Sequence, residues 1–86
     1  MKKLVDTLNP KCEKITEEAY DYLFKVNGAA EGLAWDTHIL LAHLDKTFTL
    51  DYDGQMRLLT MAAQADAISN EIVDLINAIR EKGMEP

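Results

Sequence analysis

The clearest hydrophobic pattern lies in the second half of the chain, where apolar residues recur at alternating steps of three and four. This spacing puts them on one face of a helix and is typical of a seam that packs along another helix. The seam consists of Leu58, Met61, Ala65, Ile68, Ile72, Leu75 and Ile79. Because Arg80, Lys82 and Gly83 supply the cations and the glycine that commonly end a helix, we predict a helix over about 53–82.

The first half of the chain also shows helical spacing. Asn9 and Pro10 form a typical helix start, because Asn caps free amides and Pro is tolerated in the first turn. The residues that then stay on one side of a single helix are Tyr22, Val26, Ala30, Leu33, Thr37, Leu40, Leu44 and Phe48. We therefore predict a helix over about 10–48. Asn27 and Gly28 form a turn dipeptide, so a break at this point, giving three helices, is the alternative.

The segment TLDYDG separates the two predicted helices. Asp51 or Asp53 can cap the second helix, and Gly54 adds freedom for a tight reversal. A calcium loop is disfavoured because the position that needs a bidentate glutamate holds Ala62. We therefore predict a turn over about 49–53. The stretch LDYDGQ resembles the connection of Rop-type plasmid copy-number proteins, and this resemblance implies an antiparallel helical hairpin.

If the chain reverses near Tyr52, bulky residues of one helix face small residues of the other. Leu40, Leu41 and Leu44 are then expected to meet Ala62, Ala63 and Ala65, and Gly28, Ala29 and Gly32 to meet Ile72, Leu75 and Ile76. In this register the glycines are packing residues, which favours a continuous first helix. The expected fold is a single all-α domain over 1–86, either an antiparallel helical hairpin or a three-helix bundle, with a long C-terminal helix.

A second apolar stripe lies on the opposite side of the first predicted helix. It consists of Tyr20, Phe24, Trp35, Ile39 and Ala42. A two-helix hairpin covers only one side of each helix, so we expect this stripe to meet another chain. The other chain is either a second copy or a target protein. A second copy gives a homodimeric helical bundle. The same stripe can also contact both. The alternative is that residues 1–15 fold back over the stripe.

The charge of the chain disfavours direct nucleic-acid binding. Fifteen acidic and nine basic residues give a net charge of −6, and the basic residues form no stripe that would neutralise phosphates. The acidic excess leaves an acidic mimic of nucleic acid as an alternative function. The first apolar run is too short for a signal peptide or a membrane span, and Cys12 is the single cysteine. We therefore expect a cytoplasmic protein without membrane contact.

Two histidines are candidate metal ligands. His38 and His43 are five residues apart, which turns their side chains about 140° away from one another on a helix. Zinc ligands on one helix stand three or four residues apart, so these two histidines are poorly placed to share an ion. We interpret them as solvated residues and Cys12 as a small core residue, and we expect neither a metal nor a cofactor.

An enzymatic alternative comes from the segment KITEEAYD, which resembles the EExxE motif of all-α nucleotide pyrophosphohydrolases of the MazG and phosphoribosyl-ATP type. The segment LAWDTHILLAHL is similar to the helix that follows in that family. The resemblance implies a magnesium site formed by Glu17, Glu18, Asp21 and Asp36. The glutamate of the second motif falls on Leu33, so one carboxylate that the family uses is missing.

Other catalytic motifs are not recognisable, since the sequence contains no nucleophile elbow, phosphate loop or arginine cluster. We therefore expect a small non-catalytic protein-binding module, which acts as an adaptor, a regulator or an inhibitor of an unidentified protein target. The small size of the chain also fits an accessory protein of a phage or plasmid. The expected contact surface is Tyr20, Phe24, Trp35, Ile39 and Ala42, because large aromatic groups contribute most burial per residue.

Overall fold

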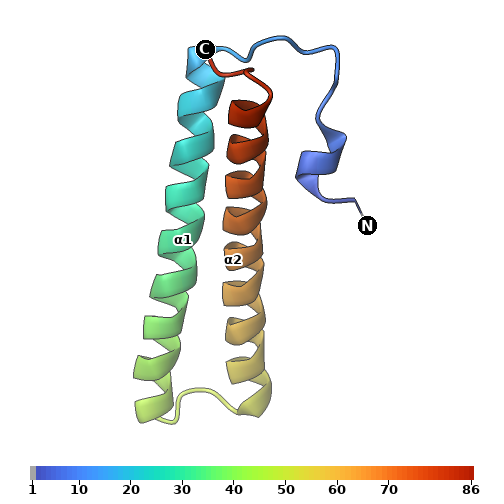
Figure 1. Ribbon diagram of the computed structural model, residues 1–86. Helices are drawn as coiled ribbons and strands as arrows, with labels where there is room; N and C mark the ends of the chain where they lie inside the picture. The colour runs from blue at the N-terminus through green and yellow to red at the C-terminus, as the bar shows by residue number, and fades with distance from the viewer. Residues whose placement is uncertain (1) are drawn as a thin grey trace.

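The computed structural model describes residues 2–86 and contains two long antiparallel α-helices that form a hairpin (Figure 1). α1 spans Glu17–Lys46 and α2 spans Tyr52–Glu81, and a short 3-10 helix, η1, spans Leu4–Thr7. Residues 2–86 contain no strand. The hairpin is a thin rod with extents of 53 × 26 × 15 Å. The prediction of an all-α helical hairpin is confirmed.

α1 begins at Glu17, seven residues after the predicted start at Pro10. Thr16 caps α1, because its hydroxyl oxygen accepts a hydrogen bond of 3.1 Å from the backbone amide of Ala19. Two glutamates follow in the first turn, where they favourably meet the positive end of the helix dipole. Asn9 instead closes a tight turn, since its side-chain oxygen accepts from the Lys11 amide. Asn9 thus caps a local turn, and the helix starts after Thr16 instead.

α1 is continuous through Asn27 and Gly28, so the alternative of three separate helices does not describe the structure. The turn dipeptide is overridden by a contact between the helices. The hydroxyl of the buried Ser69 in α2 donates a hydrogen bond of 2.6 Å to the Asn27 side-chain oxygen. This bond holds Asn27 against α2 in helical conformation, and the two interior glycines are tolerated.

The chain reverses earlier than expected. α1 ends at Lys46 and α2 starts at Tyr52, with the Asp51 side chain accepting from the Gly54 amide at 2.9 Å. The turn is therefore centred near Thr49 rather than near Tyr52. Each α1 residue consequently faces a residue of α2 that lies about six positions earlier than the sequence-based register implied.

This change of register corrects the expected packing. The two helices meet through small side chains at mid-length, namely Ala30, Ala34, Ala62, Ala65 and Ser69. Bulky residues do not fill slots at the glycines, because a Cβ atom added at Gly28 or Gly32 would meet nothing within 4 Å. The stripe expected to face α2 is largely exposed at Tyr22, Val26, Leu33, Leu40 and Phe48.

The open end of the hairpin is closed by both terminal segments. The buried Ile76, Ile79 and Met84 form the larger part of the core there. The Met84 amide donates to the Ile79 carbonyl, and the Met84 carbonyl accepts from the Ile15 amide, both at 2.9 Å. The chain that leads into α1 is thereby tied to the chain that leaves α2.

The N-terminal segment packs on α2, and among the described elements η1 contacts α2 alone (Figure 1). The Leu4 amide donates a hydrogen bond of 2.9 Å to a carboxylate oxygen of Glu71. Leu4 and Thr7 lie beside Ile68 and Ile72 of α2. Residues 1–15 were the alternative cover for the aromatic stripe of α1, and η1, at residues 4–7, does not take that place. Neither long helix has an apolar stretch that would carry it across a membrane.

Candidate functional site

One side of the hairpin carries a groove that we call the Trp35 face. Its floor consists of small side chains from both helices, Ala34 and Ala62. Its walls and rim are formed by Glu31, Trp35, His38, Leu59, Ala63 and Asp66. The groove has a volume of about 410 Å³ and is open to solvent. It therefore offers an apolar floor between two charged edges.

Trp35 is the most prominent residue of this face, with 69% of its surface exposed. Ile39 and Ala42, one and two turns further along α1, are also exposed. These three members of the predicted contact surface thus continue along one side of the hairpin. The small neighbours in the groove leave most of the indole exposed.

Tyr20 and Phe24, the other two members of the predicted surface, take part in a contact within the chain. Their rings meet edge to face, with centroids 5.1 Å apart. Arg80 of α2 donates a hydrogen bond of 2.8 Å from Nε to the Tyr20 hydroxyl, and its guanidinium lies 5.5 Å from the Phe24 ring centroid. The predicted stripe is therefore divided into a cluster tied to α2 and an open part around Trp35.

The opposite side of the hairpin carries a second groove, which we call the Leu33 face. It is lined by Leu33, Thr37, Met61, Gln64, Ala65 and Ile68, and none of these side chains is ionisable. Leu33 and Trp35 lie two residues apart and hence about 160° apart round α1. This face was not predicted from the sequence, because the expected register placed Leu33 and Thr37 in the core.

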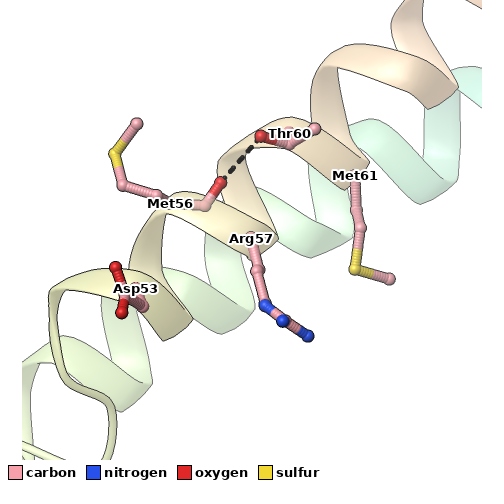
Figure 2. A pocket seen from close by; sticks show the side chains of 5 residues that line it. All are labelled: Asp53, Met56, Arg57, Thr60 and Met61. Atoms are coloured by element: carbon pink, nitrogen blue, oxygen red, sulfur yellow. Dashed lines mark hydrogen bonds between the residues drawn. The ribbon is translucent and has the colours of Figure 1, made fainter.

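A third depression lies on the outer side of the first turns of α2 and is shown in Figure 2. Asp53, Met56, Arg57, Thr60 and Met61 line it. The Thr60 hydroxyl donates to the Met56 carbonyl at 2.9 Å, so this hydroxyl is engaged by the backbone. The depression offers two methionines and two opposite charges.

The residues of the two metal interpretations are not brought together. Over residues 2–86 no group of three His, Cys, Asp or Glu side chains has an arrangement that could hold an ion. Glu17, Glu18 and Asp21 lie at the start of α1, whereas Asp36 lies about 22–28 Å further along the same helix axis. His38 lines the Trp35 face, and Cys12 is half-buried in the N-terminal segment.

Comparison with models of protein families, with curated proteins and with solved structures found no match to this chain. Indications of function therefore come from the surfaces of the hairpin itself.

Proposed function

We propose that the protein is a non-catalytic protein-binding module, an adaptor, regulator or inhibitor, whose Trp35 face binds a helix of a partner protein. The observation that carries the proposal is the exposed Trp35 beside a groove floored by alanines. A large aromatic side chain next to a small-residue floor is typical of the anchors that dominate protein interfaces. Burying such a side chain contributes more than any polar contact at the rim.

The shape of the groove favours a helical partner. It runs between two antiparallel helices, and a third helix laid along them completes a compact layer by packing its ridges into this groove. Apolar side chains at steps of three and four on the partner would meet Trp35 on one side and Leu59 on the other. Small floor residues such as Ala62 allow the partner to approach closely.

The charges of the face favour a basic partner. Glu31 and Asp66 lie along the edges of the groove, and the whole chain carries a net charge of −6. Positive side chains that flank the apolar anchors of the partner would lie beside these carboxylates. Such complementarity steers association and discriminates against acidic partners.

The proposal includes assembly of the hairpin into a homodimeric bundle. The radius of gyration is 16.8 Å, whereas a compact domain of this length has about 12 Å. A lone hairpin leaves most of each helix uncovered, and a two-layer arrangement of helices is the usual way to cover them.

Titration with two designed amphipathic helical peptides tests the proposal. The peptides share one leucine pattern and differ in their polar positions, which are lysine in one and glutamate in the other. Since Trp35 is the single tryptophan, its emission reports the binding directly. We expect the lysine peptide to bind with a blue shift of the Trp35 emission and the glutamate peptide not to bind.

Calorimetry of two variants then tests whether the peptide binds at the Trp35 face or at another exposed aromatic residue. Trp35→Ala should weaken binding of the lysine peptide at least about tenfold. Tyr52→Ala is the matched control, because Tyr52 is an exposed aromatic residue away from the groove, and it should bind as the wild type does. Failure of the wild type to bind either peptide, or equal binding by Trp35→Ala, overturns the proposal.

A further inference from the structure

We propose that the Leu33 face docks a second copy of this chain, so that two hairpins form a four-helix bundle with both Trp35 faces outward. This inference depends on the proposed pairing of hairpins but not on the proposed role of Trp35. It assigns the self-contact to a surface on the opposite side of the hairpin from the aromatic stripe.

The surface area of the hairpin indicates how much burial is missing. The chain exposes 6522 Å², whereas a compact chain of 9.7 kDa exposes about 5,100 Å². The excess is about 1,400 Å² per chain, so two copies that cover it bury about 2,800 Å² together. Stable homodimer interfaces fall in this range. A second copy therefore supplies the amount of burial by which the lone hairpin falls short.

The position of the exposed apolar side chains indicates where this burial takes place. Leu33 is 61% exposed and Met61 is 57% exposed, and they lie on either side of one groove. Val26, Leu40 and Ile68 are exposed as well. These residues come from both helices, so an isologous contact between two copies covers all of them at once.

The charges indicate which occupant fits. Self-association of a chain with a net charge of −6 brings like charges together unless the contact surface is free of them. The lining of the Leu33 face contains no ionisable side chain, and the Thr37 hydroxyl donates to the Leu33 carbonyl at 2.6 Å. The Trp35 face, by contrast, carries Glu31 and Asp66 on its edges. A second acidic hairpin is therefore accommodated on the Leu33 face and repelled by the Trp35 face.

The N-terminal segment defines one end of the docking surface. η1 contacts α2, and Leu4 lines one depression together with Ile68 and Ile72, so the N-terminal segment borders this side of α2. Towards the turn the same side of α2 is open at Met61. The docking surface therefore extends from Ile68, beside the N-terminal segment, towards the turn.

Oxidation of the wild-type protein by peroxide tests the assignment with an internal control. Figure 2 shows Met56 and Met61 pointing to opposite sides of α2, with Arg57 between them. In a lone hairpin Met61 is 57% exposed and Met56 is 42% exposed, so Met61 should oxidise at least as fast as Met56. Docking at the Leu33 face reverses this order, and we expect Met61 to react about threefold more slowly or slower still.

Sedimentation equilibrium on the same samples gives the mass in solution. We expect twice 9.7 kDa for the wild type. Leu33→Glu should reduce the mass to one chain, and Trp35→Glu, a matched charge on the opposite flank, should leave it doubled. A wild type with the mass of one chain overturns the inference. A doubled mass with Met61 reacting as fast as Met56 also overturns it, since the copies then meet at another face. Both measurements on the wild type stand even if Leu33→Glu does not fold.

Discussion

The side-chain oxygen of Asn27 accepts a 2.6 Å hydrogen bond from the hydroxyl of Ser69, and this contact joins α1 to α2 at mid-length. Ser69 is buried and Asn27 is half-buried, so neither group is freely solvated in the folded protein. The bond lies among alanines, where a slip of either helix would leave both polar groups without a partner. It therefore fixes the register of the hairpin more firmly than the alanines themselves do.

A double-mutant cycle tests this role of the hydrogen bond. Asn27→Ala leaves the Ser69 hydroxyl buried without its partner, and we expect a loss of about 1–2 kcal/mol in the free energy of unfolding. Ser69→Ala should cost about 1 kcal/mol. The double variant should lose clearly less than both together, because one interaction is removed twice. Urea denaturation measures the three values, and strict additivity would show that the two residues are not coupled.

The glycines of α1 should be replaceable without loss. A Cβ atom at Gly28 or Gly32 meets nothing within 4 Å, and both residues lie inside a continuous helix. Gly28→Ala and Gly32→Ala should each raise the free energy of unfolding by about 0.5–1 kcal/mol, since alanine favours the helix. Thermal and urea unfolding measure the gain. A loss of stability in either variant would show that another side chain occupies that space.

Introducing a glycine after α1 and removing the glycine after α2 should have opposite effects on stability. After both helices one residue adopts a left-handed conformation, Phe48 with φ of 53° and Gly83 with φ of 68°. Glycine adopts this conformation without strain, whereas other residues do so at a cost. Phe48→Gly should therefore stabilise the protein by about 0.5–1 kcal/mol, and Gly83→Ala should destabilise it by about 1 kcal/mol. Chemical denaturation of both variants checks the paired signs, and equal signs would contradict the described turns.

The contact between the helices should not accept larger side chains. Ala65 is buried between α1 and α2, whereas Ala67, two residues on, is exposed. Ala65→Leu should destabilise the hairpin by about 1–3 kcal/mol through overpacking. Ala67→Leu adds the same atoms in the same helix and should change the stability by less than about 0.5 kcal/mol. Urea titration measures the two free energies of unfolding, and the value for Ala65→Leu should be the lower one. A tolerated leucine at residue 65 would argue against the close contact.

Local sequence signals predicted the elements well. The helical spacing of the second half, the Asp51 cap and Gly83 gave α2 nearly to its ends. The start of α1 was wrong, because Asn9 and Pro10 satisfy the rules for a cap but close a separate turn. Two adequate start signals lie within eight residues of each other, and spacing alone does not choose between them.

The register of the hairpin was much harder to predict. A shift of the turn centre from Tyr52 to Thr49 moves every facing pair by about six residues, which is nearly two helical turns. Both registers keep apolar residues near one another, so hydrophobic spacing does not distinguish them. The hydrogen bond between Asn27 and Ser69 distinguishes them, but two isolated polar residues 42 positions apart form no pattern that predicts such a bond. Because of this error the Leu33 face was not predicted, whereas the exposure of Trp35 was.

Acrylamide quenching of Trp35 in the unmodified protein, at concentrations where the copies are paired, tests the central claim most directly. We propose that the self-contact lies on the Leu33 face and that Trp35, 69% exposed, stays open for a partner. We therefore expect emission at long wavelength, and quenching close to that of a free tryptophan derivative, in the paired protein. Blue-shifted emission that is shielded from acrylamide in the paired protein, and becomes accessible on dilution, would contradict it.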